Sequence, residues 1–255
     1  MTQHRRRQQR RGGVAGAAGV VGELLMTLGA LVLLFVVWQL WWTDVESDRA
    51  HAATVTSLSR AFADAPSQGP AEPDATDATD AAGAAGVPGV PGVPAGAFAI
   101  VRVPRFGADY ARPLVEGTSA AELAEGLGHY TGTAGPGEIG NFAVAGHRTT
   151  YGKPLAEIDR LQQGDRVVVE TRQGWTVYAV TTHEIVRPSQ SEVIAAVPGD
   201  RTAKPTRAVL TLTACHPRFS AKFRWVTHAD LVETRTRAQG PPSLAVSTAS
   251  ANGGP

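Results

Sequence analysis

Cysteine is almost absent from this chain of 255 residues, which contains only Cys215. A single thiol has no cysteine partner within the chain, so the sequence excludes a disulfide framework as the basis of the fold. A structural zinc site is also disfavoured, because Cys215 has no second ligand at the close spacing that such sites show. Two interpretations of Cys215 remain open: a reactive nucleophile, or a small side chain of the hydrophobic core.

An excess of charge and phosphate-binding loops are missing as well. The 24 basic and 23 acidic residues leave a formal net charge of only +1 at pH 7. No stripe of lysine and arginine alternates with aromatic side chains, so nucleic-acid binding has no support. No glycine-rich phosphate loop precedes a helix, and we therefore expect no cofactor and no metal.

One long apolar run, from Leu24 to Trp42, stands near the N-terminus and follows a Gly/Ala-rich stretch. It reaches the ~20 residues that a helix needs to span a bilayer, so we predict a transmembrane helix over residues 19–42. Arginines precede it and acids follow it, so the positive-inside rule places the basic tail, residues 1–18, in the cytoplasm and the rest outside the cell. A cleaved signal peptide is the competing interpretation, but its apolar region is usually only ~7–15 residues long and ends at small residues.

Composition divides the remainder of the chain into three parts. Residues 43–96 are poor in large apolar side chains, particularly after Pro66. Such a segment buries too little surface to offset the entropy of ordering it, so we predict a stalk, with a short helix at residues 50–63 as a candidate element. Residues 97–237 contain short apolar runs broken by Gly, Pro and Asp. Their number suits one domain with a single hydrophobic core. The Gly/Pro/Ser/Ala-rich tail, residues 238–255, is predicted to be disordered.

Six segments of the predicted domain favour β-strands, because they are short and rich in β-branched and aromatic residues. They are Phe98–Val103, Asn141–Ala145, Arg166–Thr171, Trp175–Val180, Ala208–Thr213 and Arg224–Val232. One short helix is predicted at Ala120–Leu127, with Thr118 and Ser119 as candidate caps. Many short strands with few helices indicate a mainly β fold, either a mostly antiparallel barrel or a sandwich.

Cys215 ends an apolar run, and two other side chains are candidates to work with it. A cysteine attacks an acyl carbon as thiolate, and a nearby histidine or cation must favour that form because the thiol pKa is ordinarily near ~8.5. His147, in the run Ala145-Gly146-His147-Arg148, could be this partner. Arg224, nine residues after Cys215, could stabilise an oxyanion with its rigid guanidinium, and would share a rim of the barrel with Cys215 if the two lie on neighbouring strands.

Each of these residues also has an ordinary structural interpretation. His147 could be a surface histidine at a strand end, and Arg224 could be an ion-pair partner. His216 is a rival base beside Cys215, but neighbours along an extended strand point to opposite faces, which makes direct pairing of the two side chains awkward. The spacing alone permits a shared site without requiring one.

Three features occur together in this sequence: the run Thr211-Leu212-Thr213-Ala214-Cys215, the downstream Arg224, and the upstream His147 run with its N-terminal anchor. In this order they resemble the sortase family, specifically the class E sortases of high-GC Gram-positive actinobacteria. The resemblance covers about residues 95–232. It implies a sortase-like closed β-barrel of about eight strands with a few short helices. It also implies that Cys215, His147 and Arg224 are catalytic, and that Thr213 has a secondary part in substrate binding.

The resemblance further implies a cysteine transpeptidase anchored in the cell membrane by a single helix. Cys215 would cleave an LAxTG/LPxTG-like sorting signal at the C-terminus of a secreted protein, between Thr and Gly, through a thioacyl intermediate. The protein would then be attached to an amine of a peptidoglycan precursor in the cell wall. Two alternatives stay open: a cell-envelope thiol hydrolase with water as acceptor, and a non-catalytic membrane-tethered β-domain in which Cys215 belongs to the core.

Overall fold

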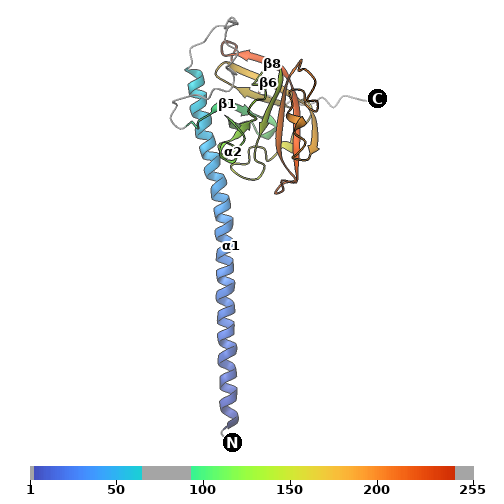
Figure 1. Ribbon diagram of the computed structural model, residues 1–255. Coiled ribbons are helices and arrows are strands. Elements are labelled where there is room, and N and C mark those ends of the chain that lie inside the picture. Colours follow the sequence, from blue (N-terminus) through green and yellow to red (C-terminus); the bar gives the residue numbers. More distant parts are fainter. Residues whose placement is uncertain (1–2, 65–92, 245–255) are drawn as a thin grey trace, which may run out of the picture. The chain divides into compact units, whose positions relative to one another are not determined.

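The computed structural model describes residues 3–64 and 93–244, and the chain divides into two compact units after Val45 (Figure 1). The predicted stalk between residues 65 and 92 and the end of the predicted tail, residues 245–255, lie outside the described residues. The first unit holds most of helix α1 (Gln3–Ala63), and the second holds the end of α1 and a β-barrel.

Eight strands form a closed barrel in the order β1-β2-β3-β4-β7-β8-β6-β5, with β1 also paired to β5. The strands are β1 (Ala97–Arg102), β2 (Ala111–Glu116), β3 (Leu127–His129), β4 (Gly140–Ala145), β5 (Arg166–Glu170), β6 (Gly174–Val186), β7 (Ala208–His216) and β8 (Phe223–Thr236). The pairs β2–β3 and β4–β7 are parallel and the other pairs are antiparallel. The prediction of a mainly β, closed barrel of about eight strands is confirmed.

Short helical segments connect the strands. They are α2 (Ala120–Ala124) and the 3₁₀ turns η1 (Pro104–Phe106), η2 (Ile158–Arg160), η3 (Ser191–Ile194) and η4 (Arg237–Gln239). α2 begins with a capping box, in which the backbone N–H of Ser119 donates to the Glu122 carboxylate at 2.6 Å. In the connection between β6 and β7, η3 packs Val193 into a small apolar cluster with Val186 and Val226. This cluster fixes η3 against the outer face of the barrel.

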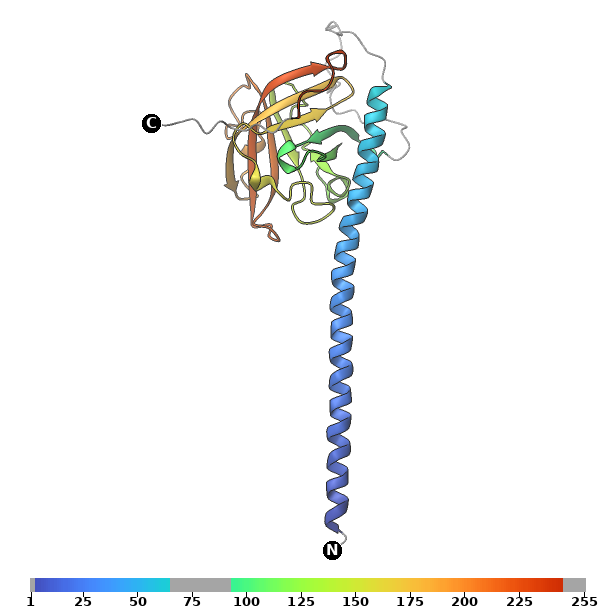
Figure 2. The same ribbon diagram turned by 180° about the vertical axis from the view of Figure 1, so that it is seen from behind.

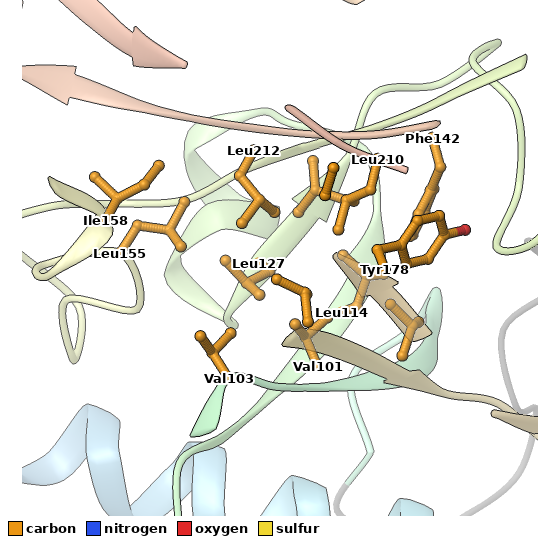
Figure 3. Packing of buried hydrophobic residues seen from close by; sticks show 14 of the residues in the cluster. Val101, Val103, Leu114, Leu127, Phe142, Leu155, Ile158, Tyr178, Leu210 and Leu212 are labelled. Atoms are coloured by element: carbon orange, nitrogen blue, oxygen red, sulfur yellow. The ribbon is translucent and has the colours of Figure 1, made fainter. Parts of the chain in front are cut away.

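Alternation along β7 sorts its side chains into two sets. Leu210, Leu212 and Ala214 belong to the main buried cluster, where they meet side chains of the other strands (Figure 3). Successive residues of a strand point to opposite faces, so Thr213 and Cys215 point to the outer face. The apolar pattern of this strand therefore directs the thiol away from the core and towards the outside of the barrel.

The end of α1 packs against the barrel within the second unit (Figure 2). Leu58 and Phe62 are 0% and 1% exposed, and they form one buried cluster with Ala97, Ile100 and Val115 of strands β1 and β2. The four-residue spacing places Leu58 and Phe62 on one face of the helix. Residues that the composition assigns to the stalk are therefore helical and partly buried.

In the first unit, α1 exposes its apolar side chains. The large apolar side chains described between Val20 and Trp42 are all exposed, and one window of the helix has a mean hydropathy of 2.5 with no buried part. By length and composition this helix is suited to cross a membrane, as an anchor or as part of a signal sequence. Trp38 and Trp42 stack at the C-terminal end of this apolar stretch, with ring centroids 5.9 Å apart. Tryptophans are enriched at membrane–water interfaces because the ring is apolar and the N–H is polar.

Candidate active site

Cys215, Arg224 and His147 lie at one end of three neighbouring strands. Cys215, near the end of β7, is paired in register with Arg224, near the start of β8. Strand β4 runs parallel to β7, and Gly146 at its end donates its N–H to the Thr213 carbonyl at 3.1 Å. His147 follows directly on this paired stretch. The topology thus places at one end of the barrel three residues that come from distant parts of the sequence.

The half-buried Cys215 has a free thiol, and its neighbour His216 is engaged elsewhere. Arg148 donates through Nη1 to Nδ1 of His216 at 2.9 Å, and the His216 ring lies 5.4 Å from the Trp225 ring between centroids. These contacts occupy Nδ1 and orient the imidazole. They weaken the case for His216 as the base that activates Cys215.

Arg148 supports this end of the barrel, although the sequence analysis assigned it no function. Its side chain is buried and forms an ion pair with Asp159 at 2.5 Å. Its Nη1 also donates to the carbonyl oxygen of Cys215 at 3.5 Å. Because a guanidinium offers several donors in a rigid fork, one side chain can hold both the Cys215 backbone and the His216 ring. Its place directly after His147 is the signal that could have identified it.

His147 has a buried nitrogen that its surroundings do not satisfy. Its Nε2 has no hydrogen-bond partner among the residues that the structure describes, and its ring lies 5.2 Å from the Tyr151 ring. Burial removes water from the charged imidazolium, and this lowers the pKa of His147 from its ordinary value of 6.5. A neutral imidazole with an unpaired nitrogen is suited to exchange a proton with a substrate or a thiol.

A cavity of about 170 Å³ lies at Arg224 on the outer face of the barrel. It is lined by Thr213, Arg224, Val226 and Tyr130, and by the connection from residues 186 to 194 that contains η3. The Tyr130 and Thr213 hydroxyls share a hydrogen bond of 3.0 Å across its floor. Thr213 is two residues from Cys215 on the same face of β7, so the cavity adjoins the thiol although Cys215 is not part of its lining.

Backbone contacts hold the Arg224 side chain at this cavity. Its Nη1 donates to the carbonyl oxygens of Ala221 and Phe223 at 3.0 and 3.1 Å. These bonds use one nitrogen of the guanidinium, which has five N–H donors in all. Within residues 3–64 and 93–244 the other donors have no hydrogen-bond partner, so they are able to face a ligand carbonyl at the cavity.

Asn141 holds the connection that contains η3, part of which lines the cavity, and this residue was not among the candidates selected from the sequence. Its Nδ2 donates to the carbonyls of Val193 and Ala195 at 3.1 and 2.9 Å. Its Oδ1 accepts a hydrogen bond from the Thr211 hydroxyl at 2.7 Å. The buried amide of Asn141 thus links strand β7 to the segment that contains η3. The signal for it is a polar residue at the start of an otherwise apolar predicted strand.

Known proteins resemble this chain in sequence and in fold. A protein-family model described as a sortase domain matches residues 101–232. Sortase SrtE1 of Streptomyces coelicolor is 33% identical over 249 residues, which cover 94% of this chain and only 64% of that protein. The solved structure of the SrtA sortase from Actinomyces oris has 39% identity and a TM-score of 0.56, covering 66% of this chain and 94% of that one. Sortase E1 from Streptomyces coelicolor, solved with a tripeptide in its active site, has 34% identity and a TM-score of 0.54, covering 58% and 95%.

Proposed function

Since the chain belongs to the sortase family, whose members are cysteine transpeptidases, we propose that it joins secreted proteins to the cell wall. The resemblance to class E sortases that the sequence analysis noted agrees with the Streptomyces sortase E relatives. One observation carries the proposal: Cys215, Arg224 and His147 lie at the same end of adjacent strands, where Arg224 lines a cavity on the outer face of the barrel.

In the first step of the proposed reaction, neutral His147 takes the proton of the Cys215 thiol, and the resulting thiolate attacks the threonine carbonyl carbon of a sorting signal and forms a C–S bond. Arg224 stabilises the oxyanion of the tetrahedral intermediate, because its charged donors are held in place before the charge develops. When the intermediate collapses, the Thr–Gly C–N bond breaks and His147 gives a proton to the leaving glycine amine. A thioacyl enzyme remains.

In the second step, an amine of a peptidoglycan precursor attacks the thioester carbonyl. His147 accepts the proton that the amine loses, the C–S bond breaks, and the Cys215 thiolate is restored. The net result exchanges one amide bond for another, so no redox partner or external energy source is needed. Water in place of the amine would give hydrolysis instead of transfer.

We propose an LAxTG- or LPxTG-like signal as the substrate. The cavity lined by Thr213 and Arg224 has a volume of about 170 Å³, which suits a side chain of an extended peptide more than a drug-sized ligand, whose pockets are roughly 300–1,000 Å³. The Streptomyces coelicolor relative was solved with a tripeptide in its active site. Thr213 would contact the peptide from the cavity floor, next to the carbonyl that Cys215 attacks.

We also propose that the protein crosses the cell membrane once, with its N-terminus in the cytoplasm and the barrel outside. The exposed apolar stretch within residues 19–42 and the arginines before it support this orientation. Residues 1–18 would be the cytoplasmic tail, residues 43–96 the connection to the barrel, residues 97–237 the catalytic domain and residues 238–255 a C-terminal tail.

The reaction can be tested on the full chain in detergent micelles, with LAxTG and LPxTG peptides and an oligoglycine amine. Mass spectrometry of the intact protein should detect a thioacyl adduct on Cys215 before the amine is added, and a ligated peptide afterwards. If the amine does not change the rate of product release and only the hydrolysed peptide forms, the protein is a hydrolase. This result would contradict the transfer step.

Three substitutions and one control test the assignment of residues. Cys215→Ala should abolish the adduct while the folded barrel persists; unchanged turnover in this variant would leave the non-catalytic β-domain as the better interpretation. His147→Ala and Arg224→Ala should each lower kcat by about 10²–10³-fold, the usual cost of losing a proton-transfer group or an oxyanion donor. Arg218→Ala is the matched control, because Arg218 is a half-exposed arginine of the connection between β7 and β8 and does not line the cavity.

A further inference from the structure

The turn that follows His147 has an unusual backbone. Tyr151, Gly152 and Lys153 all have positive φ angles, of 51°, 68° and 48°. Residues other than glycine seldom adopt this region, so two of them in one turn require support from their surroundings. The Tyr151 ring lies 5.2 Å from the His147 ring, and the N–H of Leu155 donates to the His147 carbonyl at 2.9 Å. We call residues 151–153 the Tyr151 turn. The conformation of this turn decides where the Tyr151 ring lies against the His147 ring.

An acid of α1 supports this turn through an arginine of β2. Arg112 donates through Nη2 to the Asp48 carboxylate at 2.8 Å and to the Gly152 carbonyl at 3.3 Å. The guanidinium lies 5.1 Å from the Tyr110 ring centroid, and the Tyr110 hydroxyl donates to the Pro154 carbonyl at 2.5 Å. The chain after His147 is thus held at the carbonyl groups of Gly152 and Pro154, and the contact at Gly152 comes from an arginine paired with α1.

Helix α1 also packs directly against the turn. A Cβ atom at Gly152 would lie 2.9 Å from Oδ1 of Asp48 and 3.1 Å from Nδ1 of His51, so no side chain fits there. His51 is 2% exposed, and its Nε2 donates to the carbonyl of Ala124 at 3.1 Å. Further along the helix, the buried cluster around Leu58 holds α1 on strands β1 and β2. The contacts at Asp48 and His51 are therefore part of a docked helix rather than isolated surface pairs.

We propose that residues 48–62 of α1 form a positioning element for the active site: Asp48, through Arg112, holds the Tyr151 turn and thereby keeps His147 in its working position. This inference rests on the proposed function, because it assumes that His147 transfers protons. Asp48 and Arg112 touch no reacting atom and act only through the turn. The helix that carries the apolar N-terminal segment thus also supplies a part of the catalytic domain.

The variant Asp48→Ala in the full chain tests the proposal, and Glu46→Ala is the matched control because Glu46 is an exposed acid of the same helix. We expect kcat to fall about tenfold in Asp48→Ala, since small displacements of a catalytic group cost rates of this order. KM for the sorting peptide should stay within about twofold, because the cavity at Thr213 is not touched. Glu46→Ala should match the parent in both constants.

The pH profile provides a readout that a general loss of stability would not move. Release of the Tyr151 turn admits water to His147, so the acid limb of kcat/KM should shift upward in Asp48→Ala, towards the ordinary histidine value of about 6.5. Amide exchange at Lys153, whose N–H donates to the Thr150 carbonyl at 3.0 Å, should become faster in the same variant.

A double-mutant cycle completes the test. In a Tyr151→Ala background, Asp48→Ala should cause no further shift of the acid limb, because the path from Asp48 to His147 passes through Tyr151. Suppose that the parent protein forms a thioester on Cys215. The inference is then overturned if Asp48→Ala keeps the kcat and pH profile of the parent, or if the shifts of the two substitutions add in the double variant. A parent chain that forms no thioester overturns the proposed function and this inference together.

Discussion

The imidazole of His147 is half-buried, and this burial should set the acid limit of activity. Because desolvation lowers its pKa, His147 stays neutral to a lower pH than an exposed histidine does. We expect kcat/KM to rise with pH along a limb that lies below about pH 6.5, the ordinary histidine value. The unfolded chain binds this proton more readily than the folded chain, so protonation of His147 also disfavours folding as the pH falls below that value. An acid limb clearly above pH 6.5 in the peptide cleavage assay would contradict the burial argument.

Asn141 offers a second prediction at the scale of one side chain. Asn141→Ala leaves the carbonyls of Val193 and Ala195 without their partner, and the Thr211 hydroxyl loses its acceptor. The free energy of unfolding should fall by about 1–3 kcal/mol, as measured by urea denaturation. Because the η3 connection lines the cavity, KM for the peptide should rise more than kcat falls. Gln173→Ala, at an exposed amide of the hairpin between β5 and β6, should change neither quantity.

The candidate catalytic residues could be selected from the sequence, whereas the residues that support them in the fold could not. Cys215 is the only cysteine, and His147 and Arg224 occur in recognisable runs, so residue type and order were sufficient to propose them. Arg148 and Asn141 bond to groups tens of residues away. Such partners depend on strand register, which local sequence patterns do not contain.

At the scale of elements, the end of α1 should contribute measurably to the stability of the barrel. Leu58 is fully buried against β1 and β2, and Leu58→Ala would leave a cavity at that contact. We expect a loss of about 2–5 kcal/mol in the free energy of unfolding, typical of buried leucine truncations. Thr56→Ala, on the exposed side of the same turn of helix, should stay within about 0.5 kcal/mol of the parent. Equal stability of the two variants in thermal and urea denaturation would mean that the helix is not docked in solution.

The predicted elements agree best with the structure where the chain is most apolar. All six predicted strand segments overlap strands, whereas β2 (Ala111–Glu116) and the three-residue β3 (Leu127–His129) were not predicted. β2 contains Arg112 and Pro113, and β3 contains Gly128, so neither has the β-branched pattern on which the prediction relied. Both strands exist because they pair with neighbours, β2 with β1 and β3 with β4. Pairing is a long-range contact, and it overrides weak local preference.

The length of α1 was underestimated for a similar reason. The sequence predicted a membrane helix over residues 19–42 and only a candidate helix at residues 50–63, whereas the structure has one helix from Gln3 to Ala63. Among the described residues of α1, Leu58 and Phe62 are the only large apolar side chains that are buried against the barrel. Two such residues are too few to reveal a docked face by periodicity.

At the scale of the whole molecule, the single cysteine allows a direct test of orientation. If the barrel lies outside the cell, a membrane-impermeant maleimide should label Cys215 in intact cells, at the rate seen for the detergent-solubilised protein. The half-buried thiol should react slowly but completely, and Cys215→Ala should remain unlabelled. Labelling that requires permeabilised cells would reverse the proposed orientation. Preincubation with a sorting peptide should protect the thiol, because the thioester consumes the same sulfur.

By itself, the sequence determined the mainly β character of the domain, the apolar N-terminal helix, the sortase family and the choice of three candidate catalytic side chains. These properties follow from side-chain chemistry and from patterns over a few neighbouring residues. Only the tertiary structure decided that β4, β7 and β8 place His147, Cys215 and Arg224 at one end of the barrel, and that the end of α1 packs beside the turn after His147. The physical reason is that strand register and helix docking arise from contacts between residues far apart in the chain, which become favourable only when the whole core forms.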